Sequence, residues 1–381
     1  MLETFLNAKP LYYDTIDYGR MPRIYDSIKE QFKLPKIIHI IGTNGKGTTG
    51  RFLATALHSL GFSVGHYTSP HILNFNERIW KNGRNIDTKT LDDAHQKLLT
   101  LLSPVDTEAL SYFEYTTLLA MLIYEDVEYV VLEAGLGGEY DATAVFPKLL
   151  TLVTPIAKDH EAFLGNDIKS IATTKLNAID KEAILAKQNF KEVYEIADAL
   201  ERDRGIQIYS MDSLLDDADR EKVEEISREN HLVEYLEDNL KLAISALKYL
   251  HIAYDVKDFQ KSRLYGRLTK FRENIILDVG HNTLAASAIQ KSLQGSQYTL
   301  IYNSYKDKNY EEILHILKPI ISEVEIIEVD DARVEKREVM QETIKSLHLN
   351  YAPFHKTLKQ KNYLVFGSFS VVEAFLKAYN E

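Results

Sequence analysis

The sequence predicts an α/β protein: a doubly wound parallel sheet in the N-terminal domain, followed by a smaller α/β domain. The first observation is the length of 381 residues, which at about 150 residues per domain favours two or three domains. The second is the alternation of short apolar, β-branched runs with longer amphipathic segments, typical of a parallel sheet covered by helices. The third is a glycine-rich segment between the first such run and a helical pattern, an order typical of the first crossover of such a sheet.

The first domain, residues 1–268, has its first clear strand at residues 36–41, which are apolar and β-branched. The helical pattern RFLATALHSL follows the glycine-rich segment and ends at Gly61, which suits a helix C-cap. Further along we expect helices at about residues 87–102 and 114–124, and strands at residues 128–133 and 149–155. Residues 181–248 are rich in charge, so we expect them to be largely helical, with a solvated acidic face in residues 215–239.

A second α/β pattern begins near residue 272, so we assign residues 269–381 to a second, smaller domain. Its expected strands are residues 274–279, 298–302, 324–329 and 363–366. Its expected helices are residues 285–293 and 310–317.

Composition excludes several classes of protein. The 56 acidic and 45 basic residues give a net charge of −11, so the chain has no global attraction for nucleic acid or an anionic membrane. The absence of cysteine excludes disulfides, thiolate zinc sites and cysteine nucleophiles. No apolar run approaches the roughly 20 residues that span a bilayer, and residues 1–15 lack a secretory signal pattern. We expect a soluble, cytoplasmic protein without nucleic-acid or membrane partners, whose anionic ligands are held by local cations and backbone amides.

The segment Gly42 to Thr49 (GTNGKGTT) predicts a phosphate-binding loop. Glycines let the backbone approach phosphates, and the N–H groups at the helix start point toward the anion. Lys46 supplies a cation for the β- and γ-phosphates, and Thr48 or Thr49 offers a hydroxyl near a metal. The spacing departs from the usual P-loop pattern, since Ile40 stands where its first glycine would be. The alternative is a glycine-rich turn with a solvent lysine.

Polar side chains follow three expected strands and are candidates for metal binding. Glu133 ends the strand YVVLE, Asp159 and His160 follow LTLVTP, and Ser69 lies in the loop after a further short strand. The carboxyl ends of parallel strands line the ligand crevice of a doubly wound sheet. Beside a phosphate loop, carboxylate and hydroxyl oxygens suit Mg²⁺, whereas imidazole is an unusual ligand for it. The alternative for each residue is a capping or structural role.

In the second domain, Asp278, His281 and Asn282 sit where a strand ends and a helix begins. They could bind a ligand, or Asn282 or Thr283 could simply cap the helix. Arg267, near the domain boundary, could hold a phosphate bidentately or lie in solvent.

An ordered set of motifs runs from about residue 14 to about residue 376, nearly the whole chain. In chain order they are IDYG, GTNGKGTT, TSPH with ERI, FEYTT, EAGLGGEYDAT, TPIAKDHEAFLG, Lys175, DN (Asp238, Asn239), YGRL, LDVGHN, YKDK and GSFSVVEAF. This set resembles the folylpolyglutamate synthase/dihydrofolate synthase family of the Mur ligase superfamily.

The resemblance implies a P-loop-containing, Mur ligase central-type N-terminal domain and a Rossmann-like C-terminal domain. It implies ATP-dependent amide formation in folate biosynthesis and one-carbon metabolism: a substrate carboxylate attacks the γ-phosphate, and the amino group of L-glutamate displaces phosphate from the acyl phosphate. Carboxylate and triphosphate are both anionic, so their approach needs Mg²⁺ and Lys46 to neutralise charge. Many members perform both reactions, which favours a bifunctional enzyme with dihydropteroate or folates as acceptors. Family likeness also suggests a monomer.

The resemblance also implies roles for single residues. ATP phosphates would be held by Asn44, Gly45, Lys46, Gly47 and Thr48, with Asn239 at adenine and Arg267 and Asp278 at phosphates and ribose. One Mg²⁺ would bind Ser69 and Glu133, and a second His160, assisted by a carbamylated Lys175. His281 matches a position near the transferred phosphate, so Lys46, His160, Lys175 and His281 are the expected catalytic residues. The pteroate portion would contact Asp17, Tyr18, Gly19, Phe113, Glu114, Tyr140, Asp141 and Ala142.

The sequence departs from the family pattern around Lys175, where Thr174-Lys175-Leu176-Asn177 replaces Glu-Lys-Ala-Gly. Two alternatives remain open, and this departure bears on the second. One is another amino-acid ligase of the superfamily, acting on a UDP-linked precursor, against which IDYG and FEYTT argue. The other is a nucleotide-binding homologue without catalysis.

Overall fold

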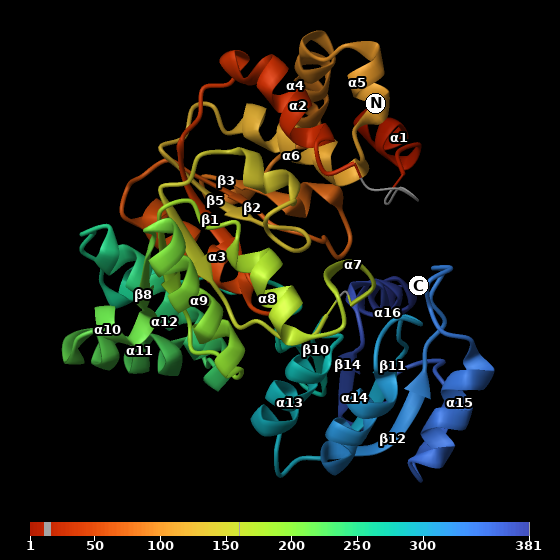
Figure 1. Cartoon of the computed structure of the whole chain (residues 1–381). Helices are drawn as coiled ribbons and strands as arrows, with labels where there is room; N and C mark the ends of the chain where they lie inside the picture. The colour runs from red at the N-terminus through yellow and green to blue at the C-terminus, as the bar shows by residue number, and fades with distance from the viewer. Residues whose placement is uncertain (11–16, 160, 381) are drawn as a thin grey trace. The chain divides into compact units, whose positions relative to one another are not determined.

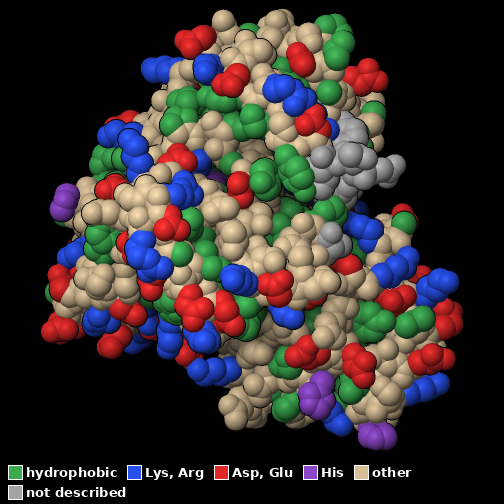
Figure 2. All heavy atoms as spheres, in the orientation of Figure 1, with side chains coloured by type: hydrophobic (Ala, Val, Ile, Leu, Met, Phe, Trp, Pro, Cys, Tyr) green, Lys and Arg blue, Asp and Glu red, His purple; other side chains and the backbone are tan. Residues whose placement is uncertain are grey.

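The computed structural model describes residues 1–10, 17–159 and 161–380, and the chain forms two compact units (Figure 1). The N-terminal unit comprises Met1–Leu232 and Leu236–Ser262, and the C-terminal unit Val233–Tyr235 and Arg263–Glu381. The boundary after residue 268 stays a prediction. On the face seen in Figure 2, acidic and basic side chains are interspersed. Within the described ranges, no helix is both long and apolar enough to cross a membrane.

An eight-stranded sheet forms the centre of the N-terminal unit, in the order β4-β3-β2-β5-β1-β6-β7-β8. The strands from β2 to β8 in this order pair in parallel, and β3 and β4 run antiparallel at one edge. The loops that follow β2, β5, β1 and β6 therefore meet at one edge of the sheet. The strands are β1 Lys36–Ile41, β2 Val64–Tyr67, β3 Ile79–Lys81, β4 Arg84–Asn85, β5 Tyr129–Glu133, β6 Leu150–Val153, β7 Glu182–Leu185 and β8 Gln207–Ser210.

Helices cover both faces of this sheet. Their bounds are α1 Leu2–Asn7, α2 Arg20–Ile28, α3 Lys46–Ser59, α4 Thr88–Leu101, α5 Pro104–Ala109, α6 Tyr112–Ile123, α7 Glu161–Leu164, α8 Ile168–Leu176, α9 Lys191–Arg204, α10 Met211–Leu214, α11 Asp217–Glu229 and α12 Glu234–Tyr249.

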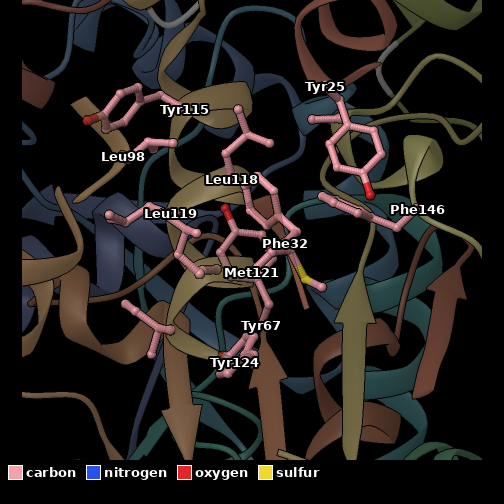
Figure 3. Packing of buried hydrophobic residues seen from close by; sticks show 14 of the residues in the cluster. Tyr25, Phe32, Tyr67, Leu98, Tyr115, Leu118, Leu119, Met121, Tyr124 and Phe146 are labelled. Atoms are coloured by element: carbon pink, nitrogen blue, oxygen red, sulfur yellow. The ribbon is translucent and has the colours of Figure 1, made fainter. Parts of the chain in front are cut away.

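Successive residues of β1 enter different cores. Ile38 and Ile40 belong to the cluster that contains α3 and α12, whereas Ile37 belongs to the cluster that contains α2, α4 and α6. Figure 3 shows part of the latter, where Tyr67 and Phe146 lie with the apolar side chains of α6. Both faces of the central strands are buried, which explains their continuous apolar runs and confirms the expected parallel architecture.

The C-terminal unit is built on a six-stranded sheet in the order β13-β12-β11-β14-β10-β9. All of its pairings are parallel except that of β9 with β10. The strands are β9 Thr269–Arg272, β10 Ile275–Leu277, β11 Tyr298–Tyr302, β12 Ile321–Ile326, β13 Asn350–Pro353 and β14 Tyr363–Phe366, and the helices are α13 Thr283–Ser292, α14 Tyr310–Leu317, α15 Arg337–Ser346 and α16 Phe369–Asn380. Both units are thus α/β, as the sequence predicts.

The secondary structure differs from expectation at three places. Residues 181–248 are largely helical, as expected, but the strands β7 and β8 also lie within them. These strands are short, and β8 is a partly exposed edge strand without an apolar run. β9 was not expected, since two of its four residues (TKFR) are charged and the strand is partly exposed. The strand expected at residues 324–329 begins earlier, at Ile321, and ends at Ile326.

Candidate functional site

The phosphate loop lies between β1 and α3. Gly42 and Gly45 have φ angles of +131° and +91°, conformations that suit glycine. Gly45 is the N-cap of α3, and no side chain within the described ranges caps this helix. The first N–H groups of a helix have no partner inside it, so this start offers donors to an anion.

Lys46 is the first residue of α3, and its ammonium group turns back over the loop. Its Nζ donates to the carbonyls of Gly42 and Thr43, each at 3.3 Å. Thr48 and Thr49 are buried, and neither Oγ1 has a hydrogen-bond partner in the described part of the chain. A buried hydroxyl without a partner calls for an explanation, and a ligand at the Thr48 hydroxyl supplies one.

Glu133 ends β5 and brings the expected metal ligands together. Its side chain is 4% exposed and accepts a short hydrogen bond from the hydroxyl of Thr68. The backbone N–H of Ser69 also donates to Glu133 Oε2, at 3.3 Å. Ser69 and Glu133 are therefore neighbours, as expected, because β2 and β5 pair in parallel and end side by side.

Lys175, on α8, lies beside the phosphate loop. Its Nζ donates to the carbonyl of Gly42 at 2.9 Å, and its side chain is buried. Burial, with a smaller effect of the Lys46 charge, lowers the pKa of Lys175 to about 7, although Asp159 and Asp141 act in the opposite direction. His160 lies outside the described residues.

Metal binding by side chains alone finds no support in the described ranges: no group of three or more His, Asp and Glu there could hold an ion. The donors present fit a different arrangement. The Glu133 carboxylate and the hydroxyls of Ser69 and Thr48 are hard oxygen ligands, and Mg²⁺ in proteins is commonly held by one or two such groups together with substrate phosphates.

Two exposed tyrosines mark the segments expected to contact the pteroate portion. Tyr18 and Tyr140 are about half exposed, and their ring centroids lie 4.4 Å apart. Asp17 pairs with Arg23 at 2.5 Å and accepts from the N–H of Gly19 at 3.0 Å. The residues IDYG and GLGGEYDAT thus meet in space, apart from Ile16, which lies outside the described residues.

Other residues of these segments engage the protein itself. Glu114 accepts from the N–H of Ser111 at 2.7 Å in a capping box and pairs with Arg20 at 2.8 Å. Phe113 lies 5.9 Å from the ring of Tyr67. These contacts hold the start of α6.

Asp141 is also engaged within its own loop. It accepts from the N–H groups of Leu136 and Thr143, at 2.8 and 2.9 Å, and burial raises its pKa. Ala142 is buried beside it. This carboxylate holds the turn of the loop, and its expected contact with the substrate stays a prediction.

Asn239 of α12 lies directly against Gly45, so closely that a Cβ there would collide with its amide group. The α12 helix packs on the same sheet face as α3. The sequence therefore identified a residue next to the phosphate loop, although the described contacts do not test its role at adenine.

In the C-terminal unit, Asp278 organises the turn after β10. It accepts from Tyr235 Oη and from the N–H groups of Leu268 and Gly280, at 3.1, 2.8 and 2.8 Å. Burial raises the pKa of Asp278, and the Arg267 charge opposes this. The Arg267 guanidinium lies 5.1 Å from the ring centroid of Phe369.

The helix that follows starts with a side-chain cap. Asn282 Oδ1 accepts from the N–H of Ala285 at 2.9 Å, so the capping interpretation of Asn282 is confirmed. His281 Nδ1 lies 3.1 Å from the carbonyl oxygen of Val279.

Sequence reasoning missed Thr68 and Tyr235. Thr68 immediately precedes Ser69, so the pairing of β2 with β5 would have placed it beside Glu133. Tyr235 lies far from Asp278 in sequence, and no local signal links them.

Comparisons with known proteins cover both units. No protein-family model matches the sequence. The solved folylpolyglutamate synthetase of Helicobacter pylori is 37% identical, with a TM-score of 0.81 over 100% of this chain and 98% of that one. The chain belongs to the folylpolyglutamate synthase/dihydrofolate synthase family.

Two further relatives of this family are similar along their whole length. The dihydrofolate synthase/folylpolyglutamate synthase of Haemophilus influenzae is 28% identical, over 96% of this chain and 94% of the relative. FolC of Escherichia coli, solved in complex with DHPP and ADP, is 25% identical with a TM-score of 0.82, over 98% of this chain and 95% of that chain. The similarity to the family therefore extends over both units and is not limited to the phosphate loop.

Proposed function

We propose that this chain is an ATP-dependent carboxylate–amine ligase that adds L-glutamate both to dihydropteroate and to folylglutamates through an acyl phosphate. One observation carries the proposal: among the described residues, the helix start after β1 has no side-chain cap and holds Lys46 and a Thr48 hydroxyl without a partner, and the Ser69–Glu133 pair lies at the ends of the neighbouring strands β2 and β5. The full-length similarity to members of the family supports it.

The phosphate loop would bind the triphosphate of ATP. The N–H groups at the start of α3 donate to phosphate oxygens, and Gly45, having no side chain, lets them come close. Lys46 already lies over the loop, so its ammonium group can follow the charge that develops on the transferred phosphate. The chain therefore contains the groups that binding of the triphosphate requires.

Ser69, Glu133 and Thr48 would hold a Mg²⁺ ion. When bound, the ion neutralises phosphate charge and lets a second anion, the substrate carboxylate, approach. The short bond from Thr68 and the N–H of Ser69 keep the Glu133 carboxylate oriented toward the loop that contains Ser69.

Lys175 would act as a carbamate that assists a second Mg²⁺ with His160. Its buried position beside Gly42 of the phosphate loop supports this proposal. A neutral amine is the form that reacts with carbon dioxide, and a pKa near 7 leaves much of Lys175 neutral at physiological pH. The neighbours Thr174 and Leu176 differ from the family pattern, but the lysine is present.

The flat ring system of the acceptor would lie against aromatic side chains. Tyr18 and Tyr140 present exposed rings within one cluster, and Phe113 packs at the start of α6. In the C-terminal unit, Arg267, Asp278 and His281 remain our candidates for nucleotide contacts. The proposed enzyme acts as a cytoplasmic monomer on small molecules, and its net charge of −11 favours no nucleic-acid partner.

The test is ADP release by the purified protein with ATP, Mg²⁺, bicarbonate and L-glutamate. One reaction contains dihydropteroate and another tetrahydrofolate, and a third omits glutamate. We expect glutamate-dependent turnover with both acceptors. Turnover with one acceptor would contradict bifunctionality, and binding of ATP without turnover on either would contradict the ligase proposal.

A further inference from the structure

Gln188, which follows β7, is a buried side-chain amide that the mechanism above does not use. It is 6% exposed. Its Oε1 accepts from the N–H of Ile156 at 2.8 Å, and its Nε2 donates to the carbonyls of Ala186 and Thr154, at 2.9 and 3.4 Å. All three bonds go to backbone, so Gln188 fixes the chain that leaves β6.

That segment, residues 154–157, in turn holds the phosphate loop. The carbonyl of Pro155 accepts from the N–H groups of both Thr43 and Asn44, at 3.0 and 3.3 Å. The hydroxyl of Thr43 donates to the carbonyl of Ala157 at 3.1 Å and accepts from its N–H at 3.0 Å. Four hydrogen bonds therefore join the beginning of the phosphate loop to residues 154–157. Gln188 binds the backbone of the same segment, at Thr154 and Ile156.

These contacts decide which amides of the loop face a ligand. The N–H groups of Thr43 and Asn44 donate to the Pro155 carbonyl, so the backbone of Asn44 already has a protein partner, and its expected role at phosphate stays a prediction. The N–H groups from Gly45 onward belong to the uncapped start of α3. The Pro155 carbonyl thus fixes the turn at Thr43 and Asn44, and this turn determines the direction of the N–H groups at the start of α3.

Gly42 makes the fit between the two segments tight. It packs against Thr154 so closely that a Cβ on Gly42 would collide with Thr154 backbone and side chain. The Thr154 N–H and hydroxyl both donate to the carbonyl of Ile41, at 2.9 and 3.2 Å. A shift of residues 154–157 would therefore be transmitted to the phosphate loop.

We propose that Gln188 is a positioning residue for nucleotide binding, acting on the phosphate loop through the Pro155 carbonyl. Its three side-chain hydrogen bonds all go to backbone, so it would act without touching phosphate or metal. The inference rests on the proposed function only in taking ATP as the ligand of the loop. A substitution of Gln188 should therefore change the KM for ATP and the affinity for Mg·ADP more than it changes the KM for the acceptor or the thermal stability.

The experiment compares the wild type with Gln188→Leu, which keeps the size and removes all three bonds, and with Gln188→Glu, which keeps only the acceptor for Ile156. Asn274→Leu is the matched control, because the Asn274 amide also donates to two backbone carbonyls but precedes β10 in the C-terminal unit. Steady-state KM for ATP, KM for the acceptor, kcat, Mg·ADP affinity and the thermal midpoint are measured for each.

We expect Gln188→Leu to raise the KM for ATP and the Kd for Mg·ADP about 10-fold, because small displacements of positioning groups are costly. The KM for the acceptor should not change. Gln188→Glu should raise both nucleotide parameters at least as much, because its second carboxyl oxygen faces the carbonyls of Ala186 and Thr154. Asn274→Leu should lower the thermal midpoint without changing either nucleotide parameter. A Gln188→Leu protein that loses thermal stability but binds Mg·ADP like the wild type would overturn the proposal.

A double-mutant cycle with Thr43→Val gives a second test, which uses Gln188→Glu if the leucine variant does not fold. If both residues act through residues 154–157, their effects on Mg·ADP affinity are non-additive. Additive effects would contradict the coupling. Failure of the proposed ligase reaction is distinguishable, since it would abolish wild-type turnover while the Mg·ADP comparison among variants still reports on Gln188.

Discussion

Each unit contains a parallel strand followed by a glycine-containing turn and a helix, yet the two helix starts differ. After β1, the N-cap of α3 is Gly45, and no side chain caps this helix in the described structure. After β10, the N-cap of α13 is Asn282, whose own amide oxygen accepts from the N–H of Ala285. The residue at the N-cap therefore decides whether a helix start is left available to an anion or is satisfied by the protein itself.

Charge sharpens the contrast. The loop before α3 carries Lys46 over its carbonyls. The turn before α13 is organised by Asp278, a buried carboxylate that accepts from Leu268 and Gly280. The first turn therefore combines N–H groups that no described side chain caps with a cation, whereas at the second the helix start is capped and the carboxylate of Asp278 lies beside the Arg267 charge.

The largest expected effect is that of Lys46→Met, which removes this cation. We expect kcat/KM for ATP to fall about 10²- to 10³-fold, the range for loss of one group that stabilises transition-state charge. Lys36→Met is the control, because Lys36 is exposed at the opposite end of β1, over the ring of Tyr129. Equal activity of the two variants in the ADP-release assay would contradict the role of Lys46.

Gly45→Ala tests the uncapped helix start. The residue has a φ of +91°, and a Cβ would collide with Asn239, so we expect Mg·ADP affinity to fall about 10-fold or more, since such strain costs of order 1–3 kcal/mol. Gly205→Ala is the matched control. Gly205 also has a left-handed backbone, with a φ of +64° at the end of α9, but a Cβ there would meet no other atom. The control should lose stability and keep its affinity, as titration calorimetry would show; the reverse pattern would refute the account.

Lys175 predicts a pH dependence of stability. Its pKa is about 7 in the folded chain against an ordinary 10.5. Between these values the unfolded chain binds the proton and the folded chain does not, so stability rises with pH by at most about 1.4 kcal/mol per unit. Below pH 7 both forms are protonated and the cost of burying the charge is complete.

The measurement is the thermal midpoint of the wild type and of Lys175→Met at pH 7 and pH 9, in buffers free of carbon dioxide. The advantage of the methionine variant should shrink at pH 9, because the wild-type lysine is then neutral. Lys169→Met, an exposed position on the same helix, should show no such trend. A constant difference between Lys175→Met and the wild type would argue against a depressed pKa.

The smallest expected effect is that of Asn282→Ala. Removal of this cap should destabilise the C-terminal unit by about 1 kcal/mol and leave the KM for ATP unchanged. Asn282→Asp, which can still cap, should restore the thermal midpoint. A rise in KM like that of Gly45→Ala would show that the second helix start also binds nucleotide and would remove the contrast between the two units.

The sequence predicted what depends on local pattern. The bounds of β1, β11 and β14 were identified, and the neighbouring ends of parallel strands brought Ser69 to Glu133. The phosphate loop was found because strand, glycines and helix are contiguous. These features need no knowledge of distant residues.

The rest depends on contacts between segments that are distant in sequence. Gln188 reaches residues 154–157, and Tyr235 reaches Asp278, through pairings that no local pattern encodes. The pairing of Glu114 with Arg20 is also distant in sequence. The partners of Asp141 are local, but a motif does not show whether a carboxylate already has protein partners. Edge strands such as β8 and β9 lack the apolar runs that reveal buried strands.

The central claim is that the phosphate loop activates a substrate carboxylate by transfer of the γ-phosphate. It is tested most directly with dihydropteroate that carries heavy oxygen in its carboxylate, incubated with the enzyme, ATP, Mg²⁺ and L-glutamate. The account predicts that the released inorganic phosphate contains one labelled oxygen for each amide formed, as mass spectrometry would detect. Amide formation with unlabelled phosphate, or with the label in AMP, would contradict it.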